Sequence, residues 1–144
     1  MKIEKAEIIH IQLPLTHSFE TSFGKVTKKD SVLVKLYSSD FIGYGEGSAL
    51  GAPLYVPEYT EETYLVLKNF LLPAVLGKEI KTPEELVKAY EFVRGHNFAK
   101  TALETAFWHI YSQQQGKSLK ELLGGTENYI AVGSMHNFSY LGGL

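Results

Sequence analysis

The segment VLVKLYSSDFIGYGEG, residues 32–47, decides the fold class. Val32 and Val34 lie at alternate positions in its first half, which predicts a strand with one buried face. Residues 38–40, Ser-Ser-Asp, are turn-forming, and residues 41–47 predict a second strand that is rich in glycine. Because parallel neighbours need a crossover of about a dozen residues or more, so short a connection predicts an antiparallel hairpin.

Upstream of this hairpin, the sequence predicts a third strand and a loop. Ile9, Ile11 and Leu13 alternate with polar residues, as expected for a strand with one apolar face. Pro14 is expected to end this strand, because proline donates no hydrogen bond to a sheet. Residues 16–29 are then expected to form a long connection to the hairpin. The three strands together predict an antiparallel meander.

Downstream, the apolar period changes from two to about 3.6 residues near Thr60, which predicts helices. Thr60 is expected to cap the first helix, and Pro73 is expected to close it. Residues 82–85, Thr-Pro-Glu-Glu, predict a second helix, which Gly95 is expected to end. Residues 118–121 repeat the spacing of a capping box and predict a short helix near the end of the chain.

Asn97 is expected to cap the longest helix. Its predicted buried face includes three alanines, whose small side chains allow another element to approach closely. Since the strands precede the helices, we predict an α+β domain: a three-stranded antiparallel meander followed by a bundle of three to four helices on one face of the sheet. The expected buried face of the long helix consists of Ala99, Ala102, Leu103, Ala106, Phe107 and Ile110.

Composition excludes several classes of protein. The 144 residues are 44% hydrophobic, which suits one compact domain, and the net charge of -2 offers no basic surface for nucleic acid. There is no cysteine, so a disulfide framework and a thiolate metal site are both excluded. No apolar run approaches the roughly 18 residues that cross a bilayer, and residues 1–5 do not resemble a signal peptide. We therefore expect a cytoplasmic protein that binds neither nucleic acid nor membrane.

No motif predicts a complete catalytic centre. Residues 43–47 lack the full glycine spacing of a nucleotide-binding loop, and the five histidines lack the spacing of a helical metal site. The sequence shows no carboxylate cluster for a divalent ion. A self-contained enzyme that uses Glu46, Glu104 or His109 is disfavoured, because nothing predicts that these side chains converge in one pocket. We therefore assign no catalytic and no metal-binding residue.

Two loops are unusually apolar. Residues 18–24 carry two phenylalanines among hydroxyl-bearing residues and glycine, and residues 49–57 are apolar and contain two prolines. Exposed apolar loops usually cover a partner surface or a ligand cavity. The same side chains could equally complete the core of the domain, so both interpretations stay open at this point.

These loops and the segments around them resemble one known family. The matching strings keep the family's order and spacing up to about Gly133, and together they are similar to the amino-terminal domain of the o-succinylbenzoate synthase and N-acylamino acid racemase group of the enolase superfamily. The resemblance implies a capping domain over residues 1–128 and the start of the first barrel strand at residues 129–133. The strings are residues 19–24, 32–34, 43–49, 53–55, 72–73, 94–97, 99–104 and 122–125.

The resemblance also implies a division of labour. In this group, a (β/α) barrel carries the lysine acid and base, and its carboxylates hold Mg²⁺, which stabilises an enolate. The amino-terminal domain acts as a lid over a small carboxylate substrate. Carried onto this chain, the resemblance implies Phe19, Thr21, Phe23 and Tyr55 as substrate-binding residues. The cofactor Mg²⁺ would belong to the full-length enzyme and not to this chain.

Two departures from the family matter. The family commonly has Trp-Asp where this chain has Trp108-His109, which affects a local helix contact. Residues 134–144 do not resemble the family, and a barrel needs on the order of 200 residues or more. We therefore expect a truncation or a shifted reading frame after Gly133, and a chain that is inactive alone.

A second function from a different class is a stand-alone interaction module. In that case the surface that a barrel would cover pairs with a separately encoded barrel chain or with a second copy, giving a homo-oligomer. The sequence leaves the reaction of the parent enzyme open between dehydration to o-succinylbenzoate, racemisation of N-acylated amino acids and a related cycloisomerisation.

Overall fold

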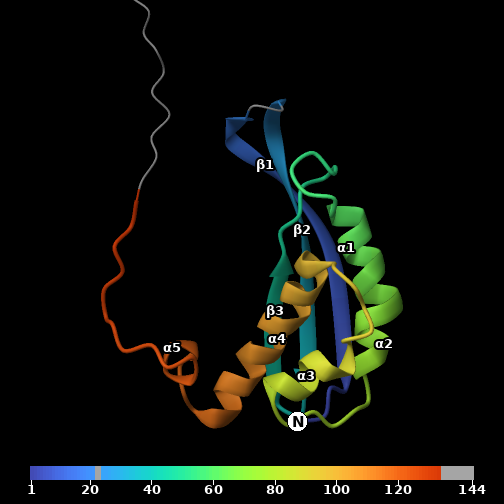
Figure 1. Cartoon of the computed structure of the whole chain (residues 1–144), viewed down its shortest axis with the longest axis vertical. Helices are drawn as coiled ribbons and strands as arrows, with labels where there is room; N and C mark the ends of the chain where they lie inside the picture. Colours follow the sequence, from blue (N-terminus) through green and yellow to red (C-terminus); the bar gives the residue numbers. More distant parts are fainter. Residues whose placement is uncertain (22–23, 134–144) are drawn as a thin grey trace, which may run out of the picture.

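The sheet of the domain has three antiparallel strands. The computed structural model describes residues 1–21 and 24–133. Strands β1 (Lys5–Thr21), β2 (Gly24–Ser38) and β3 (Phe41–Gly47) lie side by side in the order β1-β2-β3 (Figure 1). The predicted meander is therefore confirmed.

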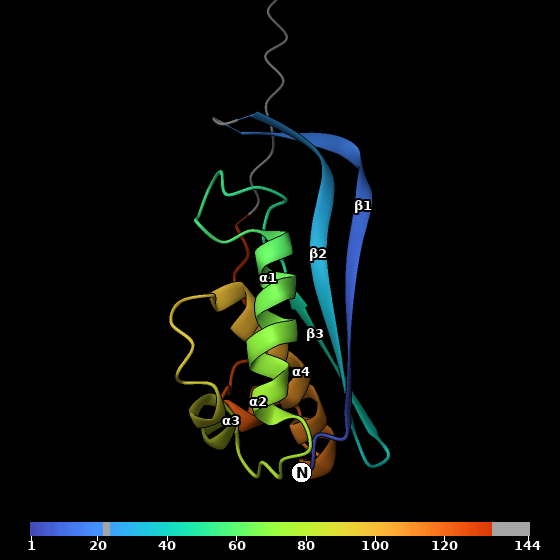
Figure 2. The same ribbon diagram turned by 90° about the vertical axis from the view of Figure 1, so that its right-hand side faces the viewer.

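The hairpin of β1 and β2 is much longer than the sequence predicts. Pro14 does not end β1, because β1 is an edge strand, where a missing N–H group is tolerated. Pairing runs through Pro14 opposite Lys28, shifts in register, and resumes with Phe19 opposite Val26. The predicted loop over residues 16–29 is therefore wrong, since most of that segment is paired. Figure 2 shows the hairpin extending beyond the helices and bending toward the side on which they lie.

One helical rod begins at Thr60 and runs past Pro73. It consists of α1 (Thr60–Val66), a π-helical turn η1 (Leu67–Leu71) and α2 (Leu72–Val75). The expectation that Pro73 closes the helix is wrong. Proline clashes with the carbonyl four residues earlier in an α-helix, and the wider π-turn immediately upstream accommodates it, with the Leu72 N–H donating to the Leu67 carbonyl.

The remaining helices are α3 (Pro83–Ala89), α4 (Asn97–Gln115) and α5 (Leu119–Leu122). The predicted caps of α3 and α5 are confirmed: Thr82 accepts from the Glu85 N–H at 3.3 Å, and Ser118 and Glu121 form a capping box. Helix α3 ends at Ala89, earlier than predicted. Since the helices cover one face of the sheet (Figure 2), the α+β fold class is confirmed.

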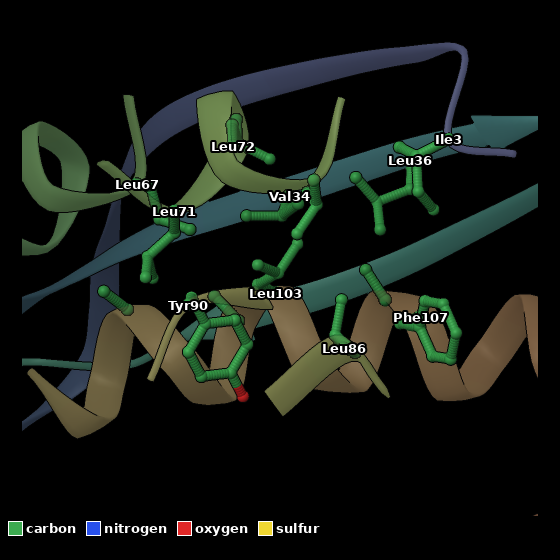
Figure 3. Packing of buried hydrophobic residues seen from close by; sticks show 14 of the residues in the cluster. Ile3, Val34, Leu36, Leu67, Leu71, Leu72, Leu86, Tyr90, Leu103 and Phe107 are labelled. Atoms are coloured by element: carbon green, nitrogen blue, oxygen red, sulfur yellow. The ribbon is translucent and has the colours of Figure 1, made fainter. Parts of the chain in front are cut away.

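The hydrophobic core lies between the sheet and the helices. Figure 3 shows side chains of α4, α3 and the α1–α2 rod meeting those of β2. All six residues predicted for the buried face of α4 are fully buried, so that prediction is confirmed. Beyond α5 the chain runs clear of this core (Figure 1), and Tyr129 is 92% exposed. The barrel strand expected at residues 129–133 stays a prediction, and residues 134–144 lie outside the described part of the chain.

Strand β3 and helix α4 touch at backbone distance. A Cβ atom placed on Gly43 would lie 2.0 Å from the Ala106 carbonyl oxygen, and one placed on Gly45 would lie 2.0 Å from the Ala102 carbonyl oxygen. Real side chains never approach this closely, so both positions require glycine. The alanines on α4 supply the matching small surface. Residues 43–47 therefore form a packing seam with α4.

A hydrogen bond between Tyr90 and Glu104 joins the end of α3 to α4. The Tyr90 ring is buried in the core and its hydroxyl donates to the Glu104 carboxylate. Burial raises the pKa of the Tyr90 hydroxyl well above its ordinary value, and the bond to Glu104 raises it further. The folded state therefore holds the phenol in its neutral, donating form.

Replacing Gly45 by alanine should destabilise the domain strongly. The new methyl group would force β3 and α4 apart, which we expect to lower the free energy of unfolding by about 3 kcal/mol. Urea denaturation followed by circular dichroism measures this change. The matched control is Gly133→Ala, where an added Cβ meets no atom within 4 Å. Equal stability of the two variants would show that the seam is not tight.

Replacing Tyr90 by phenylalanine should change how stability depends on alkaline pH. At neutral pH the variant loses one hydrogen bond to a charged acceptor, worth about 2 kcal/mol. Because the folded pKa of Tyr90 is raised, its contribution is fully present below the unfolded pKa of about 10 and is lost as the pH rises above that value.

The free energy of unfolding of the wild-type chain should therefore fall more steeply above pH 10 than that of Tyr90→Phe. The control is Tyr129→Phe, because Tyr129 is 92% exposed. Denaturation curves recorded between about pH 8 and about pH 11, a range that brackets the ordinary tyrosine pKa, measure how the free energy of unfolding changes with pH. Parallel slopes for all three proteins would contradict the burial argument.

Candidate functional site

An apolar hollow lies between the tip of the β1–β2 hairpin and the loop that follows β3. Its volume is about 750 Å³. The loop, residues 48–59, contains no helix or strand and carries the apolar segment identified in the sequence. In Figure 2 the hairpin tip bends over this loop. The hairpin, the loop and the start of α4 all contribute lining side chains, among them Phe19, Thr21, Val26, Tyr55, Val56 and Phe98.

Three of the four residues that the resemblance implies for substrate binding line this hollow. Phe19 and Thr21 come from β1, and Tyr55 comes from the loop. Phe19 is 57% exposed and Tyr55 is 76% exposed, so neither completes the core. Phe23 lies outside the described residues. Contact of these side chains with a substrate stays a prediction.

The Thr21 side chain lines the hollow and also makes a hydrogen bond within the hairpin. Its hydroxyl donates to the Gly24 carbonyl at 2.8 Å, and the two residues are also partners in the sheet. This hydrogen bond joins the last residue of β1 to the first residue of β2. Thr21 therefore helps to hold together the end of the hairpin that carries Phe19.

A short polar network lies at the edge of the hollow. Lys29 lines the hollow, and its Nζ atom donates to the Glu46 carboxylate at 2.7 Å. Ser31 donates to the same oxygen of Glu46. The Lys29 ammonium, and then the Ser31 hydroxyl, lower the pKa of the Glu46 carboxyl below its ordinary value. Glu46 is thereby held ionised and paired, which suits a structural carboxylate better than a proton donor.

Glu58 links the loop to helix α4, and the sequence did not reveal it. We expected Asn97 to cap α4, but the N-cap residue is His96, which makes no side-chain capping bond. The Glu58 carboxylate accepts the N–H groups of Asn97 and Phe98 instead, both at 2.9 Å. The partners are 39 and 40 residues apart, so no local spacing could signal the contact.

The three residues of the self-contained enzyme hypothesis are each held by a different partner. Glu46 pairs with Lys29 and Glu104 accepts from Tyr90. His109 accepts the Tyr44 backbone N–H through Nδ1 at 3.2 Å, which is the local contact made where the family commonly has aspartate. Within residues 1–21 and 24–133, no group of three or more His, Cys, Asp or Glu side chains could hold a metal ion.

No helix in the described part of the chain is long and apolar enough to cross a membrane.

Comparison with known families identifies the domain. Residues 4–124 match the family described as mandelate racemase / muconate lactonizing enzyme, N-terminal domain. The chain belongs to this family. The resemblance seen in the sequence is therefore confirmed, both for the superfamily and for the restriction to its amino-terminal domain.

Curated relatives of this mandelate racemase / muconate lactonizing enzyme domain come from several bacteria. The chain is 38% identical over 134 residues to the o-succinylbenzoate synthase of Geobacillus stearothermophilus and 35% identical over 134 residues to that of Listeria innocua. It is 38% identical over 133 residues to the N-succinylamino acid racemase of Thermus thermophilus. Each match covers 92% of this chain but 36% of the relative, so the chain spans about a third of their length.

Solved structures agree with this assignment. A member of the enolase superfamily from Listeria innocua superimposes with a TM-score of 0.83 at 34% identity, covering 88% of this chain and 34% of that one. An enolase-superfamily protein from Enterococcus faecalis gives a TM-score of 0.80 at 35% identity, covering 88% of this chain and 35% of that one. The fold of the domain is thus the enolase-like amino-terminal fold.

Proposed function

We propose that this domain is the substrate-selecting lid of an enzyme that resembles o-succinylbenzoate synthase or N-succinylamino acid racemase. The observation that carries the proposal is the apolar hollow, which the β1–β2 hairpin, the 48–59 loop and the start of α4 form in a domain whose family is assigned. Phe19 and Tyr55 supply adaptable apolar area there, and closure over a substrate would exclude water from the reacting end. The ligand would be a small carboxylate substrate held jointly with a barrel.

The proposed role contains no proton transfer by this domain. Mg²⁺ in the full-length enzyme would supply electrostatic stabilisation of an enolate, but the described residues offer no cluster to hold it, so we assign it no ligand here. The side chains of the hollow would orient the substrate and set its preferred size. We therefore propose that the chain is inactive alone. A cytoplasmic location also stays a prediction.

A chimera tests the proposed function. Residues 1–128 would replace the matching amino-terminal segment of the Geobacillus stearothermophilus o-succinylbenzoate synthase. The folded chimera should form o-succinylbenzoate or racemise an N-succinylamino acid, whereas the isolated chain should do neither. A chimera that folds but turns over none of these substrates would overturn the proposal.

Within that chimera, Phe19→Ala should raise KM about ten-fold with little change in kcat, because it removes apolar contact area remote from the chemistry. The matched control is Phe92→Ala. Phe92 is 59% exposed, close to the 57% of Phe19, but it does not line the hollow. Steady-state kinetics measure both variants. Equal KM values for the two variants would show that Phe19 does not meet the substrate.

A second candidate function, a stand-alone interaction module, rests on a different observation. Beyond α4 the chain exposes several large apolar side chains: Leu123 at 68%, Tyr129 at 92%, Ile130 at 85% and Val132 at 86%. Apolar surface gathered in this way favours association with another chain. The module would pair with a separate barrel chain or with a second copy.

Sedimentation of the isolated chain distinguishes the two candidates. If the exposed segment drives self-association, the sedimentation coefficient should rise with protein concentration, and replacing Ile130 and Val132 by serine should abolish the rise. The control replaces Val87 of α3 and Leu65 of α1 by serine; these side chains are 44% and 45% exposed. A wild-type chain that stays monomeric at all concentrations would argue against self-association.

A further inference from the structure

The loop that forms one wall of the hollow is closed at its base by Thr60. The Thr60 hydroxyl donates to the carbonyls of Ala49 and Leu50, at 2.9 and 3.0 Å, and its backbone N–H donates to the Leu50 carbonyl at 2.9 Å. These bonds fix where the loop leaves and rejoins the core. They do not involve residues 51–58, which lie between these two ends of the loop.

Glu58, two residues before Thr60, joins the end of the loop to α4. Its two carboxylate oxygens accept from two successive backbone N–H groups, those of Asn97 and Phe98, each at 2.9 Å. Such charge-assisted bonds are stronger than neutral ones, and the positive end of a 19-residue helix adds attraction for a carboxylate. The N-cap residue His96 has left-handed backbone angles, φ 55° and ψ 50°, and offers no competing side-chain cap.

The same contact lies in the lining of the hollow. Phe98, which donates to Glu58, lines the hollow, as do Tyr55 and Val56 from the loop and Glu58 itself. The opposite wall comes from the hairpin. The distance between the two walls therefore depends on how the loop is held against α4, since the seam with β3 fixes α4 relative to the sheet.

We propose that Glu58 is a positioning residue that sets the width of the hollow by holding the Tyr55–Val56 wall against the first turn of α4. Glu58 acts through the loop and does not itself select the substrate. The part of the inference that concerns substrate affinity rests on the proposed lid function, whereas the part that concerns the loop position does not.

Distance measurements between spin labels test the position of the wall. The chain has no cysteine, so the pair Thr27→Cys and Leu54→Cys places one label on the hairpin and one on the loop. With Glu58 intact we expect one narrow distance distribution. Glu58→Ala should widen it about two-fold, and Glu58→Gln, which keeps one acceptor oxygen, should widen it less.

The matched control is Glu61→Ala, because Glu61 is an exposed glutamate nearby that does not line the hollow. Circular dichroism of each variant verifies that the domain is folded, and Glu58→Gln keeps the test decisive if Glu58→Ala unfolds. We also expect the Asn97 and Phe98 amide hydrogens to exchange about ten-fold faster in Glu58→Ala. A distribution that stays narrow in folded Glu58 variants would overturn the proposal.

Kinetics in the chimera described above complete the test. Glu58→Ala should raise KM about ten-fold while kcat changes less than about two-fold, since a displaced wall weakens binding more than it alters the chemistry. A widened distribution with an unchanged KM would overturn the part of the inference that concerns substrate affinity. If the chimera with wild-type Glu58 is inactive, the lid function fails instead, and the label distances still decide whether Glu58 sets the width.

Discussion

The backbone contact between β3 and α4 is the constraint on which the rest of the domain depends. The carbonyl oxygens of Ala102 and Ala106 occupy the places that Cβ atoms of Gly45 and Gly43 would need. A helix held this closely cannot slide or tilt on the sheet without steric overlap. The start of α4 is therefore a fixed point next to the hairpin, and the floor of the hollow is built on it at Phe98.

The two walls of the hollow lie outside the hydrophobic core, whereas its floor rests on a helix of the core. The hairpin extends past the helices (Figure 2), and none of the core residues lies in the described segments 9–21 and 24–30. The 48–59 loop has no strand or helix of its own. Elements with few core contacts open and close at low cost, which suits a lid. A rigid floor combined with adjustable walls allows small changes in a wall to alter selectivity without destabilising the fold.

The sequence predicted those features that depend on neighbours along the chain. The alternation in β2 and the alanine-rich face of α4 gave the layers and the core, because burial imposes periods of two and 3.6. Features that depend on partners distant in the sequence could not be predicted. The Glu58 cap of α4 joins residues that are 39 and 40 positions apart, and the Tyr90–Glu104 hydrogen bond joins residues that are 14 positions apart. The rules that proline ends a strand or a helix failed at Pro14 and Pro73. An edge strand tolerates the missing N–H group of proline, and a π-turn accommodates its ring, whereas a central strand and an α-helix do not.

In the proposed role, the pairing of polar groups at the hollow favours substrate selection over proton transfer. Lys29 and Glu46 form an ion pair at its edge, and both carboxylate oxygens of Glu58 accept from backbone N–H groups of α4. Apart from His17, Thr21 and Ser48, the rest of the lining is apolar and aromatic surface. Such surface discriminates by size and shape, about 1–3 kcal/mol for a methylene group, and it cannot move a proton. In the proposed role, therefore, changes to the hollow should alter which substrate is preferred and leave the reaction itself to the rest of the enzyme.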